Sequence, residues 1–257
     1  MGIDLIRAFG VGAINPNSNL QNKRVSFGNS TDTFQHTSPT NYATEDAIKY
    51  AIKTNPAIKN ILKEMNAPVK LNMKELEHIL NNHAKDVQNI ATGIINNLPK
   101  GLKEHVNVKS VKEASLLHDV GKVLIPAEIL NKPGKLDSQE QKIMHRHSEL
   151  GYEILKNTNI DTRTLNLIKY HHQNANHNGY PAVKTDFFAD INLQILSASD
   201  KFSALTEERT YKKALTDKEA LAIIYKDVQI GNLHPFVFKA LYDFVNTKPA
   251  KTTVNML

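Results

Sequence analysis

The residues best suited to chemistry in this 257-residue chain are histidines and aspartates spread over several separate stretches. The pair His118-Asp119 opens the run HDVGKVLIP, and the other candidates lie in stretches that read as helix. Imidazole and carboxylate ligands together favour first-row transition metals, whereas calcium and magnesium prefer shells of oxygen alone. The sequence therefore predicts a metal-dependent hydrolase. Its ligand candidates are His83, His118, Asp119, His147, His171, His172 and Asp200.

Two of these histidines lie on the apolar faces of predicted helices. His83 falls within a stripe of aliphatic residues that recur three and four positions apart from Leu76 to Ile94, and His147 is flanked in the same way. His145 falls off the second stripe and is expected to face water. A single inward histidine is more often a core residue bonded to a backbone carbonyl. Two such histidines on two helices favour a shared site.

The remaining ligand candidates have structural alternatives. His171 and His172 would lie about 100° apart on a helix, so both reach one site only at a helix end or beside a wide cleft. The alternative for this pair is two exposed histidines before a loop. Asp119 and Asp200 follow apolar stretches, where an isolated carboxylate needs a cation or several hydrogen-bond donors. For Asp200 the alternative is a helix N-cap or an ion pair with a nearby Lys or Arg.

Helical patterns dominate from Thr44 onward, and strand signals are nearly absent. Four segments resemble capping boxes, in which a cap side chain and a Glu three residues later satisfy the free N–H groups of a first helical turn. Turn residues predict loops between 126 and 137 and between 174 and 190. The chain is therefore predicted to be all-α. The four predicted helix starts are Asn72, Ser110, Asp137 and Thr216.

Composition is that of an ordinary soluble globular protein, with 40% hydrophobic and 23% charged residues. The absence of cysteine excludes disulfides, thiolate metal sites and cysteine nucleophiles, so a metal must be bound by His, Asp or Glu. Neither a membrane span nor a signal peptide is expected, which predicts a cytoplasmic protein. The net charge of +6 suits a phosphorylated ligand. The basic residues are scattered, which disfavours a nucleic-acid polymer as the partner.

An ordered set of motifs resembles the HD-GYP subgroup of the HD phosphohydrolase superfamily. The set comprises HDVGKVLIPAEILNKPGKLDSQE, then the run 147–151 (HSELG), then HHQNANHNGYP and finally ILSASDKFSALTEERTYKKAL. A bare HD dipeptide occurs often by chance, whereas the ordered set is specific. The resemblance implies a compact helical bundle with a bimetal or trimetal centre. It also implies cyclic di-GMP as the substrate, hydrolysed to the linear dinucleotide or to GMP by a metal-bound hydroxide.

The resemblance assigns the ligand candidates to two divalent ions, with iron or manganese favoured over nickel, cobalt or zinc. Asp119 would belong to both sets and bridge the ions, which suits a carboxylate with two oxygens. The first ion would be held by His83, His118, Asp119 and Asp200. The second would be held by Asp119, His147, His171 and His172.

Four further residues would act on the substrate by the same resemblance. Lys122 would contact the scissile phosphate or the attacking water, and its alternative is a solvated surface lysine. Tyr180 would line the base pocket. Arg209 and Lys212 would bind phosphate, a task that suits the planar fork of donors on arginine.

Several residues depart from the family pattern. Gln173 and Asn176 replace a Glu and an Asp; if those acids support the histidines, the amides keep the hydrogen bonds but lose the charge. Ser203 stands where the family has an Asp, three positions after Asp200. Ile79 replaces the Glu that supports a third metal in some members, so two metals are predicted.

The chain divides into three predicted parts. Residues 1–43 form a low-complexity, partly disordered segment, and residues 44–70 a helical extension that could pack on the core or form a homodimer contact. Residues 71–248 form the metal phosphohydrolase domain, with a cyclic dinucleotide as its substrate. Two other functions stay open beside cyclic di-GMP hydrolysis. One is hydrolysis of another nucleotide or cyclic dinucleotide, and the other is a catalytically silent domain that binds a ligand or partner.

Overall fold

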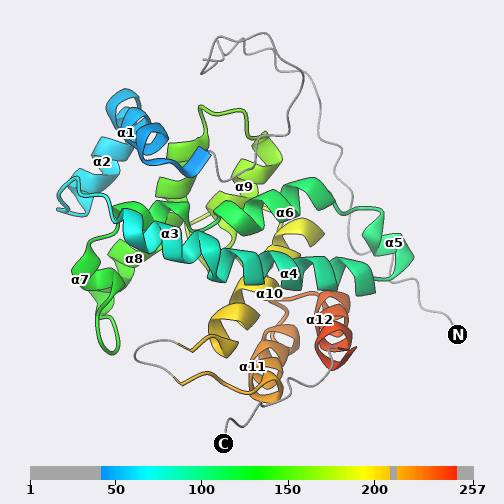
Figure 1. Cartoon of the computed structure of the whole chain (residues 1–257). Coiled ribbons are helices and arrows are strands. Elements are labelled where there is room, and N and C mark those ends of the chain that lie inside the picture. Colours follow the sequence, from blue (N-terminus) through cyan, green and yellow to red (C-terminus); the bar gives the residue numbers. More distant parts are fainter. Residues whose placement is uncertain (1–41, 209–212, 248–257) are drawn as a thin grey trace, which may run out of the picture.

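The computed structural model describes residues 42–208 and 213–247, and every regular element in these ranges is a helix (Figure 1). The all-α prediction is therefore confirmed. None of the described helices is long and apolar enough to cross a membrane. In chain order the elements are α1 (Glu45–Thr54), α2 (Pro56–Glu64), α3 (Met73–Asn81), α4 (His83–Asn97), α5 (Lys100–Lys103), α6 (Val108–Leu117), the 3-10 helix η3 (Val120–Leu124), α7 (Ala127–Leu130), α8 (Ser138–Leu155), α9 (Thr162–Tyr170), α10 (Ile191–Thr206), α11 (Asp217–Gln229) and α12 (Pro235–Thr247).

Helix α4 lies at the centre of the bundle. It packs against α6 on one side and against α10 and α12 on the other (Figure 1). Its apolar residues Val87, Ile90 and Ile94 are almost completely buried, in agreement with the predicted stripe. Each such side chain contributes about 1.5–3 kcal/mol by leaving water. Helix α4 therefore provides rigid support for the site.

The predicted helix starts are only partly correct. Asp137 and Thr216 form complete capping boxes with Glu140 and Glu219, as the sequence predicts. The prediction for Ser110 is wrong, because α6 begins two residues earlier and is capped by Asn107. The Ser110 hydroxyl instead donates to Asp161 Oδ2, 3.1 Å away and 51 positions along the chain.

The helix predicted to run from Asn72 through Ile94 is broken in two. The chain leaves helical geometry at Asn82, with φ −116° and ψ −83°, between α3 and α4. Asn72 itself makes no cap bond, and its side-chain amide donates to the Ile125 carbonyl at 2.6 Å. The break makes His83 the first residue of α4.

The N-terminal helices α1 and α2 pack against α8. Ile48, Ile58 and Leu62 are buried and belong to the same core as the rest of the bundle. Asn55 caps α2 and donates from Nδ2 to the backbone and the carboxylate of Glu153 in α8. Of the predicted N-terminal segment, residues 1–41 lie outside the described residues. The three-part division of the chain stays a prediction.

Candidate metal centre

The ligand candidates come from six helical elements that meet inside the bundle. His83 opens α4, and the pair His118-Asp119 lies at the joint between α6 and η3. The other four candidates are His147 in α8, His171 and His172 directly after α9, and Asp200 in α10. His118 is completely buried, and only the His172 side chain is appreciably exposed, at 27%. The structure thus brings all seven predicted ligands together.

Their ligand atoms form overlapping groups in which all atoms lie within 4.8 Å of one another. Asp119 lies between the two outer groups. Its Oδ2 is 3.4 Å from His118 Nε2, and its Oδ1 is 3.4 Å from His147 Nε2. The carboxylate therefore presents one oxygen to each side. The groups are His83, His118 and Asp200; His147, His171 and His172; and, between them, His118, Asp119 and His171.

Buried acceptor atoms point at one another in this centre. The Nδ1 atoms of His147 and His171 bond to the carbonyls of Met144 and Ile168, at 2.6 and 2.7 Å. A carbonyl oxygen can only accept, so each Nδ1 carries the proton and each Nε2 presents a lone pair. The two Nε2 atoms nevertheless lie 3.3 Å apart. Two lone pairs cannot form a hydrogen bond, and a cation between them would remove the conflict.

Two other buried atoms of the centre lack any hydrogen-bond partner in the structure, namely His118 Nε2 and Asp119 Oδ1. A buried polar atom without a partner costs about 1–3 kcal/mol, and more when it is charged. Both atoms are of the types that coordinate first-row transition metals. The donor set therefore fits metal ions.

The electrostatics of the centre also favour a positive charge. Burial alone would lower the pKa of His118, but Asp119 and Asp200 outweigh it and raise that pKa to about 10. Burial opposes ionisation of Asp119, yet the Lys122 ammonium and His118 hold the pKa of its carboxyl well below the usual value. Burial lowers the pKa of His147 to about 3, which keeps that imidazole in the neutral form that binds metals.

Lys122 and Tyr180 flank the more exposed side of the centre. Lys122 Nζ lies 2.6 Å from Asp119 Oδ2, so in this structure it pairs with a ligand candidate. The Tyr180 ring lies 4.5 Å from that of His172. It also stacks on His145 with ring centroids 3.7 Å apart, so the prediction that His145 faces water is only partly correct: this ring covers one face and the residue is half-buried. Arg209 and Lys212 lie outside the described residues.

Gln173 and Asn176, which stand where the family has a Glu and an Asp, hold the loop between α9 and α10 in place. Gln173 is buried and donates from Nε2 to the Pro181 carbonyl at 2.7 Å. Asn176 donates to the Ile230 carbonyl, also at 2.7 Å. None of these bonds reaches a histidine, so both residues hold the backbone rather than the ligands. A carboxylate at position 173 could not donate to Pro181.

Gly121 allows η3 to lie directly on α8, and this contact places Asp119 beside His147. A Cβ at position 121 would collide with the His147 carbonyl oxygen and would lie 2.5 Å from the Gly151 amide nitrogen. Neither backbone atom can move without displacing the helix. We expect Gly121→Ala to lower the free energy of unfolding by about 1–3 kcal/mol or more, measured by chemical denaturation.

Gly151→Ala is the matched control for this contact, because Gly151 lies on the facing helix. A Cβ there would meet two side-chain atoms and the Gly121 backbone nitrogen at 3.3 to 3.4 Å, which shifts of a few tenths of an ångström relieve. The free energy of unfolding should fall much less than in Gly121→Ala. Equal losses in the two variants would show that the η3 contact is not the tight one.

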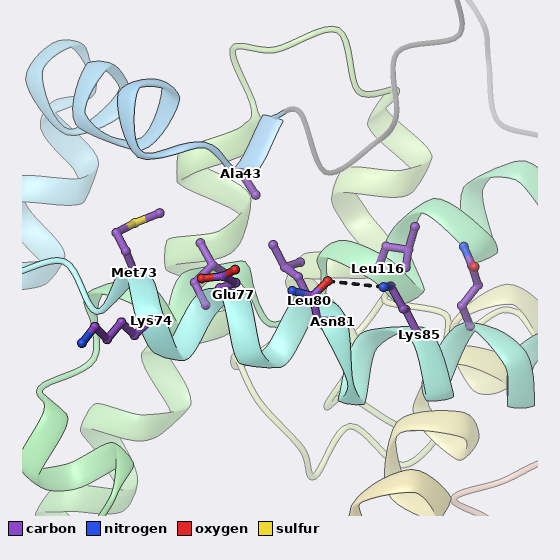
Figure 2. A pocket seen from close by; sticks show the side chains of 10 residues that line it. Ala43, Met73, Lys74, Glu77, Leu80, Asn81, Lys85 and Leu116 are labelled. Atoms are coloured by element: carbon purple, nitrogen blue, oxygen red, sulfur yellow. Dashed lines mark hydrogen bonds between the residues drawn. The ribbon is translucent and has the colours of Figure 1, made fainter.

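Two hollows lie near the bundle surface, and neither is centred on the ligand groups. A groove of about 750 Å³ runs along α3 and the start of α4, with Met73, Leu80 and Leu116 on its apolar wall (Figure 2). It contains none of the ligand candidates. A second cavity, of about 690 Å³, includes His83 in its wall together with Asp86 and Glu207.

Comparison with known proteins places the centre within a family. The family model described as HD domain matches residues 67–230, which is more than half of the chain. The cyclic di-GMP phosphodiesterase response regulator RpfG of Xanthomonas campestris is 38% identical over 128 residues, covering 49% of this chain and 33% of that protein. The 3'3'-cGAMP-specific phosphodiesterase 2 of Vibrio cholerae is 42% identical over 113 residues, covering 42% of this chain and 21% of that protein.

This chain therefore spans a third or less of the length of these two curated relatives. Among solved structures, Bd1817, a HDG"Y"P protein from Bdellovibrio bacteriovorus, superposes with a TM-score of 0.55 at 15% identity. The superposition covers 81% of this chain and 68% of that one. It supports the fold.

Proposed function

Because the chain belongs to the HD-domain family, as an HD-GYP-like member, we propose that it is a metal-dependent phosphodiesterase that hydrolyses cyclic di-GMP to the linear dinucleotide or GMP. The observation that carries the proposal is the buried contact between His147 Nε2 and His171 Nε2, both of which present lone pairs. Such a contact suits a cation that both nitrogens coordinate. The relatives named as phosphodiesterases supply the reaction class.

The residues divide into two ligand sets that share Asp119. Asp119 Oδ2 faces the set formed by His83, His118 and Asp200, and Oδ1 faces the set formed by His147, His171 and His172. Iron or manganese suits these nitrogen and oxygen donors best, with nickel, cobalt or zinc also compatible. When bound, two divalent ions supply positive charge against a phosphodiester and acidify a water molecule.

The substrate is proposed to approach on the side of Lys122 and Tyr180. Lys122 is 20% exposed and lies at the edge of the centre, where its ammonium can bind a phosphate oxygen. The described lining of the cavity beside His83 includes the carboxylates of Asp86, Glu207 and Asp217. Tyr180 covers His172 and can pack against a base. The Asp119 carboxylate holds the Lys122 ammonium toward the centre.

A second candidate substrate is 3'3'-cGAMP, because a relative specific for it is 42% identical to this chain. Both substrates present the same phosphodiester linkage to the centre. The bases differ, so any preference should arise near Tyr180 and the loop that Gln173 fastens.

The test is turnover of each dinucleotide by the full chain, reconstituted without oxygen with iron or manganese. We expect hydrolysis of cyclic di-GMP with a higher kcat/KM than that of 3'3'-cGAMP, and no turnover after chelation. A higher kcat/KM on 3'3'-cGAMP would establish the second candidate. Absence of turnover on both, from protein that retains two metals, would exclude both candidates.

A further inference from the structure

Three histidines of the centre are oriented by the backbone of their own helices. His118, His147 and His171 each donate from Nδ1 to the carbonyl three residues earlier, at 3.0, 2.6 and 2.7 Å. A backbone carbonyl is present whatever the side chain. The tautomers of these three rings are therefore fixed by helix geometry alone.

His83 lacks this support because α4 begins with it. Leu80, three residues earlier, belongs to α3 on the other side of the break at Asn82, and among the described residues His83 Nδ1 bonds to no backbone oxygen. It lies 3.2 Å from Ser203 Oγ in α10. Ser203 is 1% exposed, and its hydroxyl lies 2.8 Å from Asp86 Oδ2, one turn along α4 from His83.

The direction of these hydrogen bonds follows from their chemistry. A carboxylate can only accept, so the single Ser203 O–H proton points to Asp86. The lone pairs of Ser203 must then accept from His83, which places the ring proton on Nδ1. His83 Nε2, 3.1 Å from Asp200 Oδ1, is then the ring nitrogen left to coordinate an ion; without an ion, a proton on Nε2 would donate to that carboxylate. The form with its proton on Nδ1 is the tautomer that a ligand histidine needs, reached through two side chains instead of a carbonyl.

We propose that Ser203 and Asp86 form a positioning pair that fixes the tautomer of His83 and thereby sets the metal affinity of one half of the centre. The inference rests on the proposed function, because it presupposes that His83 is a ligand. Ser203 stands where the HD-GYP pattern has an Asp. Its hydroxyl links the Asp86 carboxylate of α4 to His83 from this position. A charged partner behind a ligand histidine makes the coordinating nitrogen more basic.

A rival partner for the same nitrogen is Glu207, whose Oε2 lies 3.6 Å from His83 Nδ1. This distance exceeds a good hydrogen bond, whereas the Ser203 contact does not. The Glu207 side chain is also 26% exposed, against 5% for His83. Ser203 is therefore the better positioned acceptor.

The first test measures metal affinity by titration against a competing chelator. Ser203→Ala should lower the affinity for one of the two ions by about 10- to 100-fold, the usual effect of removing an outer hydrogen-bond partner of a ligand. The other ion should bind as before, because two of its three histidines, His147 and His171, are held by backbone carbonyls and not by Ser203. Asp86→Ala should lower the affinity for the same ion, and the double variant with Ser203→Ala should bind that ion little more weakly than either single variant. Ser203→Thr, which keeps the hydroxyl, should restore the affinity.

Ser199→Ala is the matched control, because Ser199 is equally buried on α10 and its hydroxyl bonds only to the Ile195 carbonyl. It should bind both ions with wild-type affinity. Equal affinities in Ser203→Ala and Ser199→Ala would overturn the proposal, and so would a loss seen in Glu207→Gln but not in Ser203→Ala. Wild-type protein that binds no metal would instead contradict the proposed function, and the proposal with it.

A second readout needs no metal. Nitrogen-15 NMR of the metal-free protein distinguishes the two tautomers of each ring. Wild-type His83 should carry a proton on Nδ1, and Ser203→Ala should shift the ring toward the tautomer with its proton on Nε2, which can donate to Asp200, while His147 stays unchanged. A wild-type His83 without a proton on Nδ1 would overturn the positioning role, even if both metals bind.

Discussion

Asp119→Ala is expected to lose both metal ions and with them all measurable hydrolysis. Asp119 gives one oxygen to each ligand set, with Oδ1 facing His147 and Oδ2 facing His118 and His83. The change also frees the Lys122 ammonium, which would then stand unpaired beside the ions and repel them. Metal affinity should fall by well over the roughly 100-fold that outer partners cause. Elemental analysis and turnover on the same preparation check both effects.

Asp227→Ala provides the control for this change. Asp227 also pairs with a lysine, Lys201, but on α11 and away from the ligand groups. It should keep wild-type metal content and turnover. If Asp119→Ala retained one tightly bound ion, the carboxylate would serve one ligand set and not both, and the proposed bridge would be wrong.

The ligand candidates could be selected from sequence because chemistry and periodicity agree there. His83 and His147 lie on apolar stripes, and a polar residue on such a stripe must point into the interior. The adjacent pair His171-His172 required a helix end or a wide cleft, and α9 does end at Tyr170. Local pattern therefore carries enough information to say which side chains face inward. What they bind there stays a proposal.

Features that depend on contacts between distant segments could not be predicted in this way. The pattern at Ser110 satisfies the capping rule, yet a partner 51 positions away takes its hydroxyl and Asn107 caps the helix. His145 was expected in water because the stripe says nothing about Tyr180, which comes from a loop after the next helix. In both cases a contact with a residue remote in sequence overrides the local rule.

The break at Asn82 had the largest consequence for the site. An aliphatic stripe continues across it, so periodicity alone predicts one helix. The break separates His83 from the helix that precedes it, and His83 Nδ1 contacts Ser203 where three other histidines of the centre contact a carbonyl of their own helix. In the sequence Ser203 is visible only as a departure from a family pattern. Its partner Asp86, one turn after His83, becomes identifiable once α4 and α10 are placed side by side.

Binding of metal should raise the thermal stability of the protein strongly. In the metal-free protein the centre holds facing lone pairs, buried carboxylates and two buried atoms without partners, all of which oppose folding. An ion that binds only the folded chain stabilises it by about 4 kcal/mol at a thousandfold excess over its Kd. For a chain of this size that corresponds to a rise in Tm of about 8–16 °C per ion. Differential scanning fluorimetry of chelated protein, titrated with manganese or iron, measures the shift.

Magnesium and calcium are the matched control ions, since both prefer oxygen shells over a centre with five imidazoles. They should leave Tm nearly unchanged at the same concentration, and manganese should have little effect on Asp119→Ala. A rise of equal size with magnesium would indicate a general ionic effect on a basic protein. An unchanged Tm with every transition metal would show that the buried acceptors are tolerated without a cation, and the proposed metal centre would then be wrong.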